Sequence, residues 1–163
     1  MTTSGPDAVS VLTDARWFKG SLEDLVAVRG VMTRPLLRKD FTIDEYQLWE
    51  ARASGADAAL LIVAALDRRA LRDLHQAAKG VGVHTLLEAH TSAELEEALA
   101  IGARVVGVNN RNLQTLTTDL GTSLRLLRLI PRGHVAVGES GIFTRDDVER
   151  VAEGIRDLMA MRS

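Results

Sequence analysis

The chain has 163 residues, of which 46% are hydrophobic and 26% charged, and its formal net charge is -2. This length and apolar content support a single domain over residues 1–163, and they exclude a disordered chain, which is more polar and more strongly charged. No apolar run reaches the roughly 18 residues of a spanning helix. The balanced charge argues against a nucleic-acid or membrane-surface binder.

The chain contains no cysteine and four histidines. The lack of cysteine excludes disulfides, thiolate zinc sites and cysteine nucleophiles. No two histidines have the i, i+4 spacing of a helical metal site, so we expect no histidine metal site. The first residues lack the charged head and apolar stretch of a signal peptide, and a cytoplasmic location is expected.

Short apolar runs alternate with helical patterns along the whole chain. Strands are expected at 8–13, 35–39, 58–63, 83–87, 104–108 and 135–137. Each is followed by a helical segment, at 21–28, 44–53, 67–80, 91–102, 120–129 and 144–153.

Capping residues predict where several of these helices begin and end. Ser21 is followed three residues later by Asp24, and Thr144 by Asp147, which is the spacing of a capping box. Gly154 stands where a glycine commonly ends a helix.

Regular alternation of strands and helices predicts an α/β fold with parallel strands and right-handed crossovers. Two architectures fit: an open doubly wound sheet, or all or part of a (β/α)8 TIM barrel. The first strand is not followed by G-x-G-x-x-G, and a Walker loop is absent, so the barrel is favoured. The chain is shorter than the roughly 200 to 250 residues of a closed barrel.

Polar residues follow the expected strands at their carboxyl ends: Lys39, Glu88, Asn109, Arg111 and Glu139. Each has a structural alternative, as a solvated lysine, a helix cap or a turn residue. In a parallel sheet these ends lie on one side, which is where such folds place their active sites. Their joint placement favours a functional rim.

The residue types at this rim suit acid/base chemistry. A lysine can donate a proton to a developing alkoxide; Arg38 beside Lys39 would lower the pKa of its amine, and Asp40 would oppose that effect. Glu88 can accept a proton or stabilise a cation. The backbone N–H groups at 140–141 can bind an anion.

The same residues resemble a known family, indole-3-glycerol-phosphate synthase of tryptophan biosynthesis. The most specific stretches are LRKDF at 37–41 and GVNNRNL at 107–113, followed by Thr115. Further matches lie at 10–13, 55–57, 60–64, 86–90 and 139–142. Order and spacing agree over about residues 8–154.

The resemblance implies a (β/α)8 barrel, a lyase activity, a phosphorylated small-molecule substrate, and no metal or organic cofactor. The family closes the pyrrole ring of 1-(2-carboxyphenylamino)-1-deoxyribulose 5-phosphate and expels carbon dioxide and water. By resemblance, Lys39 is the general acid and Glu88 the assisting carboxylate. The implied substrate-binding residues are Asn109, Arg111, Glu139, Ser140 and Gly141.

Two parts of the family pattern have no match in this sequence. These are the Glu-x-Lys and Ser-Pro-Ser of the first β/α unit, and the glycine-rich phosphate-binding turn after the last strand. We therefore expect strands two to seven of an incomplete barrel, weak or absent ring closure by the chain alone, and self-association through open strand edges. The alternatives are a non-catalytic barrel remnant or assembly partner, and a phosphate-sugar-binding barrel of altered specificity.

Overall fold

The computed structural model describes residues 5–112 and 115–160, which form six strands and the helices between them. Contacts divide the chain into two compact units, Met1–Leu86 and Leu87–Ser163. No helix among the described residues is long and apolar enough to cross a membrane.

The first unit contains three β/α pairs and the start of a fourth strand. Its elements are β1 (Val9–Leu12), α1 (Leu22–Val31), β2 (Leu36–Lys39), α2 (Glu45–Ala53), β3 (Ala58–Ile62), a 3₁₀ turn (Val63–Ala65), α3 (Arg68–Val81) and β4 (His84–Ala89). β1 pairs with β2 in parallel from Val9 opposite Leu36 to Leu12 opposite Lys39, and β2 pairs with β3 in parallel.

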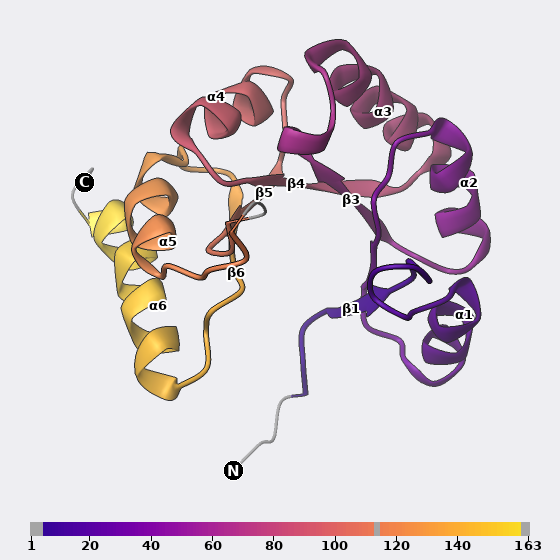
Figure 1. Cartoon of the computed structure of the whole chain (residues 1–163), viewed down its shortest axis with the longest axis horizontal. Coiled ribbons are helices and arrows are strands. Elements are labelled where there is room, and N and C mark those ends of the chain that lie inside the picture. Colours follow the sequence, from indigo (N-terminus) through magenta and orange to yellow (C-terminus); the bar gives the residue numbers. More distant parts are fainter. Residues whose placement is uncertain (1–4, 113–114, 161–163) are drawn as a thin grey trace. The chain divides into compact units, whose positions relative to one another are not determined.

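Figure 1 shows α1, α2 and α3 on one side of β1, β2 and β3. Large apolar side chains fill the layer between these helices and strands. Leu25, Leu36, Leu48, Leu61 and Leu71 are all almost fully buried there. The other face of these strands carries no helix of this unit, and it is the face on which a barrel keeps its interior.

The second unit follows the same pattern. It contains the end of β4, α4 (Ser92–Ala100), β5 (Val105–Asn109), α5 (Gly121–Leu126) with a 3₁₀ turn (Leu127–Leu129), β6 (Val135–Glu139) and α6 (Arg145–Ala160). β5 and β6 pair in parallel from Val105 opposite Val135 to Asn109 opposite Glu139. Gly138 faces the helices, since a Cβ there would lie 3.1 Å from Val151 Cγ1.

The fold prediction is confirmed. Strands that are neighbours in the sheet are also neighbours in the sequence, and a helix follows each of them. This is the order of a (β/α)-barrel wall, whereas strand order reverses in a doubly wound sheet. The chain is therefore of the TIM-barrel type, with six β/α units among its described residues.

Element ends differ from the prediction at several places, of which four bear on the site or on the caps. β4 and β6 each extend two residues further than expected, so Glu88 and Glu139 lie within strands. The segment 120–129 is a short α-helix followed by a 3₁₀ turn. The prediction that Gly154 ends the last helix is wrong, because α6 continues to Ala160. A glycine inside a helix costs only about 1 kcal/mol, which does not by itself end the helix.

The predicted capping box at the start of α6 is present. Asp147 accepts hydrogen bonds from Thr144 Oγ1 at 2.9 Å, from Thr144 N at 3.0 Å and from Phe143 N at 3.1 Å. Asp147 N in turn donates to Thr144 Oγ1 at 3.2 Å. The hydrogen bond from the Thr144 side chain, followed by those from the two backbone N–H groups, lowers the pKa of Asp147 below its usual value.

This lowered pKa predicts an acid-dependent contribution of Asp147 to stability. The folded chain favours the carboxylate, so the contribution is present above the unfolded pKa of about 4 and is lost as the pH falls through the lower folded pKa. Asp147→Asn should therefore lower the urea midpoint at pH 7 and make less difference at pH 3. Asp146→Asn, on the same helix turn, is the control; a difference between the wild type and Asp147→Asn that is equal at both pH values would contradict the prediction.

Candidate active site

The alternation of side chains along β2 places Lys39 on the face without helices. Arg38 points toward α2, where its Nη1 donates to the Gln47 carbonyl at 2.6 Å and lies 3.3 Å from Glu50 Oε2. Because neighbouring side chains of a strand point to opposite faces, Lys39 points away from α2. Lys39 is half-buried and lies at the carboxyl end of the strand.

Arg38 belongs to a buried polar network beneath α2. Its Nη2 lies 2.9 Å from Asp40 Oδ2, and Thr13 Oγ1 donates to the same oxygen at 2.7 Å. Asp40 Oδ1 accepts from Phe41 N at 2.8 Å. These bonds tie the end of β1 to the end of β2 and leave the guanidinium on the opposite face of the strand from Lys39. In LRKDF, Arg38 and Asp40 therefore hold the strand ends together.

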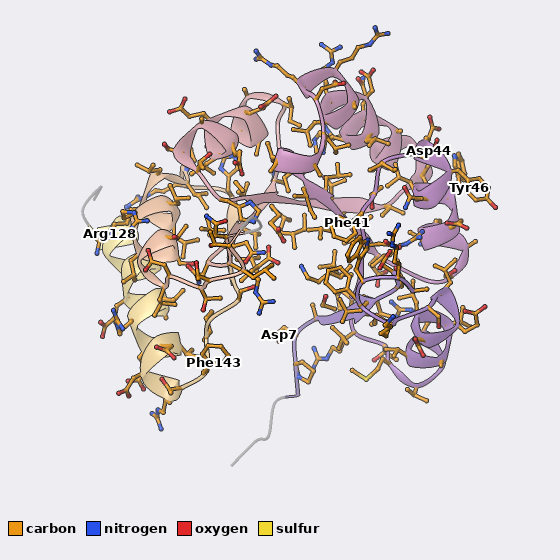
Figure 2. The ribbon with its side chains drawn as sticks, in the orientation of Figure 1. Asp7, Phe41, Asp44, Tyr46, Arg128 and Phe143 are labelled. Carbon is orange, nitrogen blue, oxygen red and sulfur yellow. The ribbon has the colours of Figure 1, made fainter. Side chains whose placement is uncertain are left out.

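Two aromatic rings that the sequence analysis did not single out stack at these strand ends. The rings of Phe18 and Phe41 lie 5.5 Å apart and almost parallel, at 12°. Figure 2 shows Phe41 on the strand side of α2, whereas Tyr46 points away from the strands. The turn that carries Phe18 requires glycine at position 20, because a Cβ there would lie 2.0 Å from the Leu12 carbonyl oxygen. In the sequence, the phenylalanine directly after LRKD could have indicated an aromatic side chain at this strand end.

Glu88 lies on the corresponding face of β4. Thr85 Oγ1 contacts His75 Nδ1 of α3 at 2.7 Å, so Thr85 points toward the helices. Three residues further along the strand, Glu88 points to the opposite face. Its side chain is only 2% exposed, and its Oε1 lies 3.4 Å from His90 Nε2. The next helix is capped by Thr91 and not by Glu88, since Thr91 Oγ1 accepts from Glu94 N.

Asn109 and Glu139 are direct neighbours at the ends of β5 and β6. The preceding pair, Val108 and Gly138, faces the helices, so Asn109 and Glu139 face the other way. Asn109 is buried, Glu139 is half-buried, and Asn109 Oδ1 accepts from Arg111 N at 2.9 Å. Asn109 therefore also closes a turn, which was the structural alternative for this position.

Asn110 holds the loops of the second unit in place. Its side chain is buried, donates to the Ser140 carbonyl at 2.9 Å and accepts from Ser123 N at 2.9 Å. Ser140 and Gly141 have φ values of +62° and +69°, in the left-handed region that favours glycine. Through its bond to the Ser140 carbonyl, Asn110 helps to hold this turn at the end of β6. In the sequence, Asn110 stands out only as part of the motif GVNNRNL.

The remaining predicted residue, Arg111, is exposed and forms an isolated antiparallel bridge with Thr118. Leu113 of the same motif lies outside the described residues. Lys39 belongs to the first unit, whereas Glu88, Asn109, Arg111 and 139–141 belong to the second. In residues 5–112 and 115–160, no group of three or more histidines and carboxylates is placed to hold a metal ion.

Comparison with known proteins matches one family over almost the whole chain. The profile of the indole-3-glycerol phosphate synthase family matches residues 1–159. The chain belongs to this family. The synthase of Nocardioides sp. is 53% identical over 156 residues, which cover 95% of this chain and 60% of the relative.

Two further relatives, both named indole-3-glycerol phosphate synthase, give the same result. That of Laribacter hongkongensis is 51% identical over 150 residues, covering 91% of this chain and 57% of the relative. That of Kineococcus radiotolerans is 52% identical over 155 residues, covering 95% and 57%. This synthase-family chain thus spans somewhat more than half the length of the curated relatives that it matches.

The buried network around Arg38 predicts the effect of removing one charge. Asp40→Asn leaves the guanidinium with less compensation at a site where the Arg38 and Asp40 side chains are 5% and 9% exposed. Breaking such a pair should lower the free energy of unfolding by about 3 kcal/mol. Urea unfolding followed by circular dichroism measures this.

Asp73→Asn is the matched control, because Asp73 pairs with Arg69 and Arg72 in an exposed position on α3. It should change stability by less than about 1 kcal/mol. Equal effects of the two substitutions would contradict a special role for the buried pair.

Proposed function

We propose that the chain takes part in the ring closure of its family, as a carbon-carbon lyase of the carboxy-lyase class in tryptophan biosynthesis, with weak or absent turnover by the chain alone. The substrate is 1-(2-carboxyphenylamino)-1-deoxyribulose 5-phosphate. A new bond joins the aromatic carbon to the ketone carbon, carbon dioxide leaves, and the hydroxyl group departs as water. The family match over residues 1–159 carries this proposal, supported by Lys39 and Glu88 at strand carboxyl ends on helix-free faces.

Lys39 is the general acid of this proposal. As the aromatic carbon attacks, the ketone oxygen gains negative charge, and a proton from the Lys39 amine neutralises it. Arg38 points to α2 and is compensated by Asp40, so Lys39 is the cation of LRKDF that points to the face without helices. Its half-buried position at the strand end suits a group that must meet both substrate and solvent.

Glu88 is the carboxylate that assists the later steps. Ring closure leaves a positively charged intermediate, which a negative group stabilises and which loses carbon dioxide. Departure of the hydroxyl as water needs a proton, and rearomatisation releases one, so a carboxyl group that takes and returns protons serves both steps. Glu88 is buried on the helix-free face, where its charge is weakly screened by water.

The second unit supplies the polar groups proposed to bind the substrate. Asn109 and Glu139 lie side by side and offer an amide and a carboxylate to substrate hydroxyl groups. The turn at 140–141, held by Asn110, offers backbone N–H groups to the phosphate. Arg111, exposed in the following loop, adds a positive charge for an anionic substrate. The chemistry uses side chains and backbone alone.

Lys39→Met tests the general acid. If ring closure occurs, this substitution should lower kcat by about 10² to 10⁴ while the circular dichroism spectrum is unchanged. Lys79→Met, at an exposed position on α3, removes the same charge as a control and should leave kcat at the wild-type value. Indole fluorescence of the product measures turnover, and an unchanged kcat in Lys39→Met would overturn the assignment.

Self-association of the chain is a separate proposal, supported by the edge strand β1. Val9 N and Thr13 N donate to Pro35 and Lys39 carbonyls, so the N–H groups of Ser10 and Leu12 point to the other edge. Leu12 is 39% exposed beside this edge. An open edge of this kind pairs readily with another chain.

Sedimentation velocity over a concentration series checks this. The 163-residue chain should show species larger than a monomer that increase with concentration. Ser10→Lys, which places a charge on the exposed edge, should shift the distribution toward monomer. A monomer at all concentrations would contradict the proposal.

A further inference from the structure

The side chain of His90 lies between two carboxylates at the end of β4. Its Nδ1 is 3.3 Å from Glu94 Oε2, and its Nε2 is 3.4 Å from Glu88 Oε1. The three side chains are 13%, 21% and 2% exposed, in the order His90, Glu94, Glu88. In the described part of the second unit, the carboxylates that contact the ring are thus one from β4 and one from α4.

The position of Glu94 follows from the start of α4. Thr91 Oγ1 accepts a hydrogen bond from Glu94 N at 3.2 Å, which is the first half of a capping box. Glu94 Oε2 accepts from the backbone N of His90 at 2.7 Å, and the same oxygen faces Nδ1 of the ring. The helix cap therefore holds an acceptor against one particular nitrogen of His90.

This acceptor sets which ring nitrogen carries hydrogen. An ionised carboxylate only accepts hydrogen bonds, so the nitrogen that faces Glu94 must be a donor. A neutral imidazole has one N–H, and with that hydrogen on Nδ1 the lone pair of Nε2 faces Glu88. Nε2 lies 3.4 Å from Glu88 Oε1 and makes no hydrogen bond to the described residues, so its lone pair is available to take a proton from that carboxyl group.

We propose that His90 is a positioning residue for Glu88, from which it takes one proton during the reaction, and that Glu94 fixes its tautomer. The inference rests on the proposed function, in which Glu88 takes and returns protons. When Glu88 takes a proton from the substrate, that proton passes from Oε1 to Nε2. The ring becomes an imidazolium that still donates from Nδ1 to Glu94, and the Glu88 carboxylate is restored. Reversal returns the proton, with no further reactant.

If His90 had a purely structural role, it would need neither a defined tautomer nor a contact between Nε2 and Glu88. Capping α4 uses only the backbone N of His90, which any residue other than proline provides. Packing of the partly buried ring requires its shape but no defined tautomer. A defined hydrogen on Nδ1, and sensitivity of Nε2 to Glu88, therefore distinguish the proposed role from packing.

Nitrogen-15 NMR of the full chain labelled at histidine tests the tautomer directly. In the wild type, Nδ1 of His90 should be protonated. Glu88→Gln, which replaces the carboxyl by an amide of the same shape, should change the Nε2 resonance and leave Nδ1 protonated. Glu94→Gln retains a residue that serves a capping box but removes the charge, and it should weaken the preference for Nδ1–H.

The exposed His84, at the other end of β4, is the internal reference, and its signals should not respond to either substitution. A His90 ring with hydrogen only on Nε2, or an Nε2 signal unaffected by Glu88→Gln, would overturn the proposal. This result does not depend on turnover, so it decides the proposal even if the chain closes no ring and the proposed function fails.

Kinetics of the same full chain test the consequence for Glu88. His90→Gln should lower kcat by about 10- to 100-fold with little change in KM, because a misplaced catalytic group affects the reaction more than substrate binding. His84→Gln, the same substitution at an exposed position, should retain the wild-type kcat. If Glu88→Gln abolishes turnover while His90→Gln turns over at the wild-type rate, the positioning role is wrong.

Discussion

The site depends on one constraint, the alternation of side chains across each parallel strand. In a strand covered by helices on one face, every second side chain points toward those helices. In β2 this sends Arg38 under α2 and Lys39 to the face without helices. The same alternation turns Thr85 toward α3 and Glu88 away from it, and it brings Asn109 beside Glu139. A shift of one residue in any of these strands would exchange the core and the proposed site.

Buried polar groups at the strand ends support this arrangement. Arg38 and Asp40 join the ends of β1 and β2, while Asn110 joins the ends of β5 and β6 to the start of α5. Each of these side chains is almost fully buried and bonded, so each restricts a loop that carries a proposed functional group. The motifs of this family chain thus contain two kinds of residue. In LRKDF, Lys39 is proposed to take part in the reaction, whereas its neighbours Arg38 and Asp40 hold the strand ends together.

Much of the fold was readable from local patterns. Apolar runs predicted six strands, and Ser21, Asp44, Asp67 and Thr91 cap the helices that follow. Local patterns failed where tertiary packing outweighs propensity. Gly154 has a weak preference against helix, yet α6 continues past it, and β4 and β6 extend far enough to include Glu88 and Glu139. Such differences at element ends are expected, because neighbouring strands stabilise residues that have no strong preference of their own.

The sequence by itself determined the α/β class, the family and the positions of Lys39, Glu88, Asn109 and Glu139 at strand ends, because these follow from periodicity and motif order along the chain. Only the tertiary structure decided what each side chain touches. It separated Arg38 from Lys39, stacked Phe18 on Phe41, and placed His90 between Glu88 and Glu94. The stacking of Phe18 on Phe41 depends on strand register and loop course, which bring together residues distant in sequence and which local preferences do not encode.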